Sequence, residues 1–209
     1  MDEAVARVFA DYDKRFAEEA AGRSEGRALT GDDRSLPIGP EAGAFLNLLI
    51  TSLRPQRILE LGTSNGYSTL WLATAAREVG AKVITVEAIA RKQAYARAAL
   101  TKAGVAGVVE FLGGDALELL KTLPGPFDFV LLDLWKELYG ACLDLFYPKL
   151  APGAIIAADN MIQPVSSRRQ AAEYRRAVRA KPQMQSLLLP VGQGIELSRF
   201  AAGLPEHLI

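Results

Sequence analysis

The sequence predicts an α/β protein built on one mostly parallel, seven-stranded sheet, with helices on both faces and a C-terminal antiparallel hairpin. Short apolar runs alternate five times with longer segments of helical periodicity, and this alternation is typical of parallel sheets. The first run, Arg57–Leu61, leads into a turn with two glycines and then into an apolar helix over 67–79. Strand, glycine turn and helix form the opening unit of a nucleotide-binding sheet.

The remaining elements follow along the chain in a regular order. An amphipathic helix over 2–20 and a polar loop over 22–33 precede an apolar helix over 41–53. Further strands are expected over 82–87, 108–112, 127–133 and 154–158, a turn over 151–153, helices over 91–103, from 115, over 135–149 and over 167–180, and hairpin strands over 185–190 and 194–200. The length favours a single domain over 1–209, with an N-terminal helix and loop over 1–35 and the α/β core over 36–209.

The composition excludes several classes of function. Acidic and basic residues balance at 24 each, so no global charge draws the chain to nucleic acid or to an anionic membrane. No apolar run approaches the ~20 residues of a membrane span, and the N-terminus lacks the apolar core of a signal peptide, so we expect a cytoplasmic protein without membrane contact. With one cysteine, Cys142, and one histidine, His207, an internal disulfide, a histidine-based triad and a histidine-rich zinc site are not expected.

The glycine turn argues against a dinucleotide. The spacing is Gly62-x-x-x-Gly66, with Glu60 inside the strand, whereas pyrophosphate binding uses G-x-G-x-x-G, so a nicotinamide dehydrogenase is not favoured. Glycines let the backbone approach a ligand closely. A carboxylate near the turn suits an ammonium group and would repel a pyrophosphate. The pattern E-x-G-x-x-x-G resembles the first motif of class I S-adenosylmethionine (SAM) methyltransferases.

Acidic residues close most of the predicted strands. Glu87 follows Gly66 by 21 residues, close to the ~20-residue offset of a ribose-binding acid, although it could also cap a helix. Asp115 begins a helix and could either reach an adenine edge or only cap that helix.

Asp133, Asp159 and Asn160 follow two neighbouring strands and supply two carboxylates and an amide oxygen. Such donors suit Mg²⁺, and without a metal two close carboxylates would raise one another's pKa. Lys136 lies three residues beyond Asp133. Its amine can therefore reach a substrate oxygen that is bound at this metal site, unless it is an ordinary surface lysine.

Two longer segments sharpen the resemblance. L-D-L-W-K-E-L-Y over 132–139 and A-D-N-M-I-Q-P over 158–164 resemble the metal and catalytic segments of the catechol O-methyltransferase family, which includes caffeoyl-CoA and bacterial O-methyltransferases. The similarity runs from about 36 to 200 and implies a Rossmann-like SAM methyltransferase fold. One departure is Leu134, which stands where the animal enzyme has a histidine beside the cofactor.

The resemblance also implies residue roles. Asp133, Asp159 and Asn160 would bind Mg²⁺ or another divalent cation such as Mn²⁺ or Ca²⁺, Lys136 would be the general base, and Glu196 would orient the second hydroxyl of the substrate. The implied cofactor-binding residues are Glu60, Gly62, Ser64, Gly66, Ser68, Glu87, Ala88, Asp115, Ala116, Asp133 and Trp135.

We therefore expect Mg²⁺-dependent methyl transfer from SAM to a hydroxyl of a small, catechol-like phenolic substrate. By family analogy we expect a homodimer, with the N-terminal helix as a plausible contact. One alternative is a tRNA wobble-uridine methyltransferase of the same fold, suggested by the arginine-rich segment 167–181. No stacking aromatics interleave with those arginines, so a solvated helix face explains them better, and nucleic acid stays the weaker alternative. A non-catalytic SAM-binding protein is the other alternative.

Overall fold

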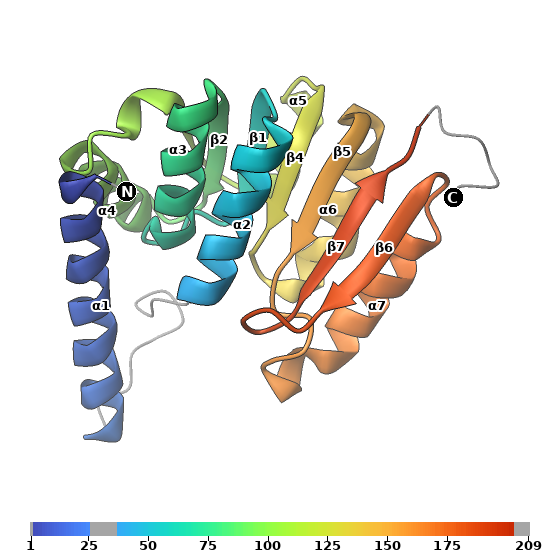
Figure 1. Cartoon of the computed structure of the whole chain (residues 1–209). Helices are drawn as coiled ribbons and strands as arrows, with labels where there is room; N and C mark the ends of the chain where they lie inside the picture. The colour runs from blue at the N-terminus through green and yellow to red at the C-terminus, as the bar shows by residue number, and fades with distance from the viewer. Residues whose placement is uncertain (1, 26–36, 203–209) are drawn as a thin grey trace.

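The computed structural model describes residues 2–25 and 37–202 around one seven-stranded sheet (Figure 1). The strands are β1 (Arg57–Leu61), β2 (Lys82–Glu87), β3 (Val109–Gly113), β4 (Phe127–Leu132), β5 (Leu150–Ala158), β6 (Met184–Leu189) and β7 (Ile195–Phe200). Their order is β3-β2-β1-β4-β5-β7-β6, and only β7 runs antiparallel to its neighbours. The chain order reverses between β1 and β4, which is where ligands bind in open α/β sheets. The predicted sheet and hairpin are confirmed.

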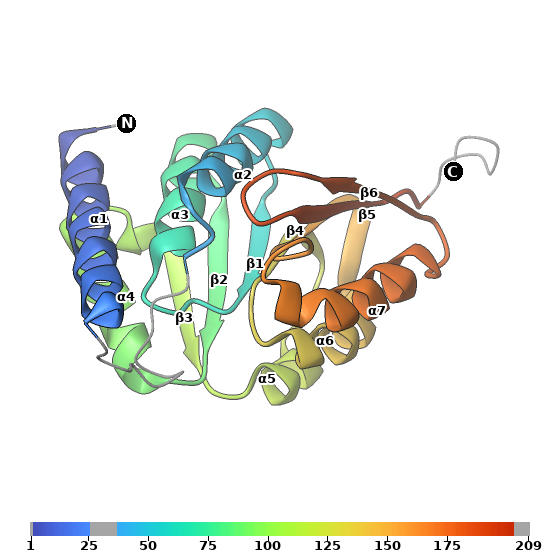
Figure 2. The same cartoon turned by 90° about the horizontal axis from the view of Figure 1, so that it is seen from below.

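The sheet separates two apolar clusters, because successive side chains of a buried strand point to opposite faces. In β1, Ile58 belongs to one cluster and Leu59 to the other. Figure 2, which looks at the carboxyl ends of the parallel strands, shows α2 and α3 on one face and α5, α6 and α7 on the other. The helices are α1 (Glu3–Ser24), α2 (Pro40–Leu53), α3 (Tyr67–Val79), α4 (Ala90–Lys102), α5 (Ala116–Thr122), α6 (Tyr139–Phe146) and α7 (Arg168–Arg179).

Helix α1 is part of the core and not an appendage to it. Its apolar stripe, which includes Val5, Val8 and Tyr12, is buried in the cluster that also contains α2, α3 and α4. The predicted division between an N-terminal segment over 1–35 and an α/β core over 36–209 therefore separates helices that pack together. Because this face of α1 is covered by the chain itself, it cannot also supply the contact of the expected homodimer.

Strand β5 differs from the prediction at its start. The residues expected to form a turn, 151–153, lie inside β5, where Phe127 pairs with Leu150 but Phe129 pairs with Ile155. The extra residues on the β5 side form an irregularity in the ladder, a position that tolerates Pro152 because proline has no backbone N–H to donate. The segment predicted as one helix over 135–149 is also divided, into the short 3₁₀ helices η2 (Lys136–Leu138) and η3 (Tyr147–Lys149) on either side of α6.

Within the part of the chain that the structure describes, no helix combines the length and the apolar character needed to cross a bilayer. His207 lies outside the described residues.

Candidate active site

Several predicted site residues lie at the carboxyl edge of the parallel strands. Here the first residue after a strand donates a backbone hydrogen bond to the adjacent strand. Gly62 N–H donates to Val86 O at 3.1 Å, Asp133 N–H to Leu61 O at 2.9 Å, and Asp159 N–H to Leu132 O at 3.1 Å. These bonds continue the ladder by one residue beyond β1, β4 and β5. They bring Gly62, Asp133 and Asp159 into one row along this edge.

Both glycines of the turn are required by the protein's own packing. Gly62 has φ +104°, and a Cβ there would collide with the backbone oxygen of Asp133. Gly66 has φ +90°, and a Cβ there would lie 2.7 Å from the Cβ of Ala96 and 3.1 Å from the hydroxyl of Tyr12. Positive φ values favour glycine, and these contacts add a steric requirement. The neighbouring backbone and helices therefore already require both glycines, and the close approach of a ligand that the glycines suggested in the sequence stays a prediction.

Glu60 of β1 forms hydrogen bonds with residues of α3 and β2 that lie next to the glycine turn. Its carboxylate is fully buried and accepts hydrogen bonds of 2.6 Å from the hydroxyls of Ser68, Thr69 and Thr85. Burial raises the pKa of Glu60 to about 7, although the three hydroxyl bonds act in the opposite direction. Thr85 Oγ1 also lies 2.5 Å from Thr63 Oγ1 in the turn. The two predicted cofactor contacts Glu60 and Ser68 are therefore bonded to each other, and their contact with a ligand stays a prediction.

Glu87 joins the end of β2 to the same turn. Its carboxylate accepts hydrogen bonds from the backbone N–H groups of Ser64 at 2.7 Å and Ile89 at 2.9 Å. Ser64 has a left-handed backbone with φ +47°. The carboxylate is thus held beside the glycine turn, as a ribose-binding acid would need to be, and ribose binding stays a prediction.

Asp115 caps helix α5. One of its carboxylate oxygens, Oδ1, accepts from Leu117 N–H at 2.8 Å and from Glu118 N–H at 3.0 Å. Of the two alternatives considered for this residue, capping is confirmed, and the adenine contact stays a prediction. Among the other predicted cofactor residues, Ala88 lies between β2 and α4, Ala116 begins α5, and Trp135 follows β4 with 55% of its surface exposed.

Lys136 lies in a half-buried position and is hydrogen-bonded to two polar side chains. Its Nζ donates to Tyr139 Oη at 2.5 Å and to Asn160 Oδ1 at 2.8 Å. Tyr139 is fully buried and donates its own hydrogen to Leu132 O at 2.8 Å. Burial lowers the pKa of Lys136, and the negative charges of Asp133 and Asp159 oppose this effect. The lysine is therefore not a free surface residue. The contact of Tyr139 with Lys136 was not predicted from the sequence, although Tyr139 is the last residue of the same 132–139 motif.

Asp159 is the most unusual group of the site. It is 1% exposed, and neither oxygen of its carboxylate has a hydrogen-bond partner. Burial and then the charge of Asp133 raise the pKa of Asp159 to about 8. Burial also raises the pKa of Asp133, against the effect of Lys136. Because a buried carboxylate without a partner is costly, this pair of acids is suited to a bound cation.

The donor set fits a hard divalent cation. Two carboxylates and an amide oxygen, from Asp133, Asp159 and Asn160, are the oxygen ligands that Mg²⁺, Mn²⁺ or Ca²⁺ accepts. Among the described residues, no group of three or more histidine, cysteine, aspartate or glutamate side chains is placed to hold a metal. A metal bound here would therefore depend on the amide as its third protein ligand.

Glu196 does not join this group. It is fully buried in β7, and its carboxylate accepts two hydrogen bonds from Arg179 of α7, at 2.7 and 3.2 Å. Its neighbours Ile195 and Leu197 contact the apolar cluster on the α2 side, so Glu196 points to the α7 side of the sheet. Its role in orienting a substrate hydroxyl stays a prediction, which this pairing does not favour.

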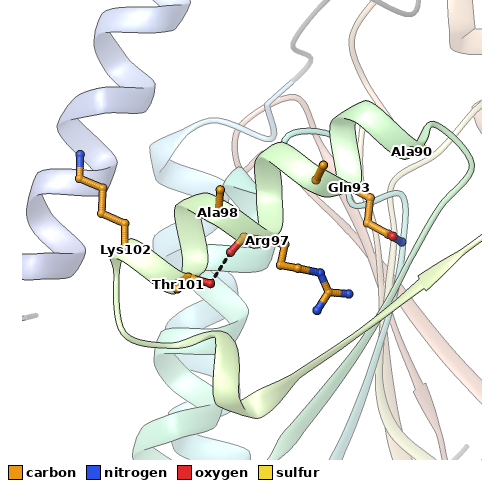
Figure 3. Close-up of a pocket in the computed structure, with 7 residues that line it drawn as sticks. Ala90, Gln93, Arg97, Ala98, Thr101 and Lys102 are labelled. Atoms are coloured by element: carbon orange, nitrogen blue, oxygen red, sulfur yellow. Dashed lines mark hydrogen bonds between the residues drawn. The ribbon is translucent and has the colours of Figure 1, made fainter.

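Two hollows have different characters. A narrow pocket at the glycine turn is lined by Phe16 of α1, by Ile38, by Ser68 of α3 and by residues of the turn and the strand ends that include Gly62 and Asp133. Figure 3 shows the second hollow, which runs along α4 and is lined by Ala90, Gln93, Ala94, Arg97, Ala98, Thr101 and Lys102. The second hollow contains none of the predicted site residues, so we place the candidate active site at the first.

Comparison with known proteins identifies the family. The family model described as O-methyltransferase matches residues 27–200. The chain belongs to the O-methyltransferase family. Among curated O-methyltransferases, the catechol O-methyltransferase of Mycobacterium tuberculosis is 40% identical over 129 residues, which span 61% of this chain and 58% of that relative. The caffeoyl-CoA O-methyltransferase of Mesembryanthemum crystallinum is 29% identical over 180 residues, 76% of this chain and 70% of that relative.

Solved structures of similar proteins share the fold. A cofactor-bound crystal structure from MTB is 30% identical, with a TM-score of 0.77, covering 96% of this chain and 91% of that one. An O-methyltransferase from Bacillus cereus in complex with SAH is 27% identical, with a TM-score of 0.74 and the same coverage of 96% and 91%. The family resemblance inferred from the motifs is therefore confirmed, and the sheet is that of an O-methyltransferase.

Proposed function

We propose that this O-methyltransferase transfers a methyl group from SAM to one hydroxyl of a small vicinal dihydroxy aromatic, and that the transfer depends on Mg²⁺ or another divalent cation. The observation that carries the proposal is the buried, unpartnered carboxylate of Asp159, beside a second acid, Asp133, and a lysine of lowered pKa, Lys136. A non-catalytic SAM-binding protein would have no use for this combination.

The cofactor part of the proposal rests on the glycine turn. The Bacillus cereus relative is in complex with SAH. Here the turn between Gly62 and Gly66 is hydrogen-bonded to Glu87 and to Tyr12 of α1, and Glu60 accepts a hydrogen bond from Ser68 just after the turn. We propose that the methionine part of SAM lies at the pocket lined by Ser68 and Asp133, and that Glu87 accepts hydrogen bonds from its ribose. Asp115 and Trp135 would lie toward the adenine.

The proposed chemistry is an in-line displacement at the methyl carbon. SAM supplies the electrophilic methyl group, and the divalent cation, held by Asp133, Asp159 and Asn160, would lower the pKa of the substrate hydroxyl. Lys136 accepts the hydroxyl proton at Nζ, for which it must be neutral. Burial favours this neutral form. The neutral amine has two N–H groups and one lone pair. The N–H groups have acceptors in Tyr139 Oη and Asn160 Oδ1, so the lone pair is available for the substrate proton.

The acceptor is proposed from the chemistry of the site and from the relatives. The curated relatives are named for catechol and caffeoyl-CoA, and a vicinal diol can bind one cation through both oxygens. The tRNA alternative draws on the five arginines of α7. Two of them form ion pairs with acids of the chain itself, Arg179 with the buried Glu196 and Arg169 with Glu173, which reduces the charge available for a nucleic acid.

The metal dependence gives the direct test. We expect methylation of a catechol in the presence of Mg²⁺, its loss in EDTA and its return when Mg²⁺ is added back. Asp159→Ala should behave like metal removal while its far-ultraviolet circular dichroism stays that of the wild type. An undermodified tRNA preparation serves as the competing acceptor. Full catechol turnover in EDTA would exclude the metal, and methylation of the tRNA alone would replace the proposed substrate.

A further inference from the structure

The orientation of the Asn160 side-chain amide is set from two sides. Lys136 Nζ donates to its oxygen, Oδ1, at 2.8 Å, whereas its nitrogen, Nδ2, donates to Gln193 Oε1 at 3.1 Å. The two ends of an asparagine amide differ, since the oxygen only accepts and the nitrogen only donates. Only the oxygen can bind a hard cation. A rotation of the amide by half a turn would therefore replace a metal ligand by an NH₂ group.

Gln193 reaches Asn160 from a distant part of the sequence. It lies in the turn between β6 and β7, which is bonded closely to the segment that follows β5. Met161 N–H donates to Gly194 O at 2.9 Å, and the N–H groups of Ile162 and Gln163 both donate to the backbone oxygen of Gln193 at 3.0 Å. Gly194 has φ +93°, and a Cβ there would lie 2.5 Å from Ile162 Cγ1. The two segments thus form one unit, with no room between them.

Asn160 itself needs this support. It has a left-handed backbone with φ +57° and stands immediately after β5 and Asp159. Its side chain is therefore at the start of a loop and not within a ladder that would hold it. The partner on the other side, Lys136, must exchange protons in the proposed reaction, whereas Gln193 does not titrate and can hold Nδ2 throughout.

We propose that Gln193 is a positioning residue for the metal ligand Asn160, turning the amide so that its oxygen faces the metal site and Lys136. The inference rests on the proposed function, because the metal site is part of that proposal. Outer hydrogen-bond partners of this kind commonly account for ~10–100-fold in metal affinity. The carbonyl of Gln193, which holds residues 162 and 163, is backbone and is unaffected by changes of its side chain.

Mn²⁺ binding, measured by calorimetry and by the electron paramagnetic resonance of free Mn²⁺, tests the inference without any turnover. Gln193→Met keeps the length of the side chain and removes the acceptor, and should weaken Mn²⁺ binding by ~10-fold or more. Gln193→Glu keeps an acceptor for Nδ2 and should bind Mn²⁺ at least as tightly as the wild type. SAM affinity should be the same in all three proteins. If Gln193→Met does not fold, Gln193→Ala replaces it.

A second background separates positioning from a general loss of structure. Asn160→Asp presents an oxygen at either end of its side chain, so its orientation no longer matters. In that background Gln193→Met should cost much less Mn²⁺ affinity than it costs with Asn160. An equal loss in both backgrounds, or no loss in either, overturns the role of Gln193 and leaves the proposed metal site standing. Absence of Mn²⁺ binding in the wild type overturns the proposed metal dependence itself.

Discussion

At the scale of single residues, hydrogen bonds and burial limit each of the side chains around Lys136 to one chemical role. Tyr139 donates its hydrogen to Leu132 O, so its oxygen is left to accept from Lys136. Burial raises the pKa of Tyr139 far above its ordinary value, so this phenol stays protonated and is not itself a base. Among the residues that the structure describes, Lys136 is then the group beside Asp133 and Asp159 whose pKa is shifted toward a neutral, proton-accepting form.

The role of Lys136 can be tested by one substitution. Lys136→Met keeps the aliphatic chain and removes the amine, so kcat with a catechol should fall by ~10²–10⁴-fold, the usual contribution of general-base catalysis. Lys136→Arg should not restore the rate, because a guanidinium does not give up its proton. SAM and Mn²⁺ affinities of both variants, measured by calorimetry, serve as controls. A Lys136→Met enzyme with the wild-type kcat would mean that the amine takes no proton.

At the scale of elements, helix α1 holds the glycine turn that we propose binds SAM. Phe9, Tyr12 and Phe16 surround the ring of Tyr67, with ring centroids 5.6, 5.5 and 5.3 Å away. Tyr67 is the first residue of α3 and directly follows the turn. The hydroxyl of Tyr12 donates to Asn65 O within the turn at 2.5 Å. The N-terminal helix therefore contributes to the shape of the site although it lies outside the parallel βα units.

This contact predicts a coupled loss of stability and affinity. Tyr12→Phe removes a buried hydrogen bond while keeping the ring, so the free energy of unfolding should fall by ~0.5–1.5 kcal/mol and SAM should bind more weakly. Tyr174→Phe is the matched control, because the hydroxyl of Tyr174 is buried without a partner. Its removal should leave stability unchanged or raise it. Urea unfolding and SAM calorimetry measure both effects, and equal results for the two variants would remove α1 from the cofactor site.

At the scale of the whole molecule, buried acids should make stability depend on pH. Burial raises the pKa of Glu60 to about 7 and, together with the charge of Asp133, that of Asp159 to about 8. In the unfolded chain such carboxyls have lost their protons by about pH 5. Between pH 5 and 8 these buried acids consequently bind more protons in the native state than in the unfolded state, so their contribution to stability falls as the pH rises. The lowered pKa of Lys136 acts in the opposite direction, but the acids with a raised pKa, which include Asp133, outnumber this one lysine.

We therefore expect the metal-free protein to lose stability, by urea unfolding, as the pH is raised from 5.5 to 8.5. Asp159→Asn removes one of the titrating groups and should make this loss smaller. Mg²⁺ should restore stability most strongly at the high-pH end, where the acids are ionised and only the native state offers the site. A stability that rises over this range, or a slope that Asp159→Asn leaves unchanged, would contradict the assignment of these raised pKa values.

The homodimer remains a prediction at this scale. The apolar stripe of α1, which includes Val5, Val8 and Tyr12, is used within the chain, so an interface would need another surface. Exposed large apolar side chains occur at Leu48 and Leu53 of α2 and at Leu187 of β6.

Much of this protein could be read from local patterns in its sequence. The strand from 57 to 61, the glycine turn and the helix from 67 to 79 are present with the predicted bounds, because a buried strand and an amphipathic helix each leave a local periodicity. The row of Gly62, Asp133 and Asp159 was also predictable. Parallel strands end at one edge of the sheet, so residues far apart in the sequence meet there without any knowledge of side-chain contacts.

The tertiary structure alone decided which side chains hold one another. Glu60 of β1 is hydrogen-bonded to Thr85 of the adjacent strand β2. Glu196 is paired with Arg179 of α7. Gln193 contacts Asn160 from a turn 33 residues away in the sequence. No periodicity marks such partners, because they depend on strand order, on register and on the path of the closing hairpin. The sequence therefore indicated where the chemistry lies, while the packing of the β6–β7 turn against the end of β5 determines how the amide of Asn160 faces it.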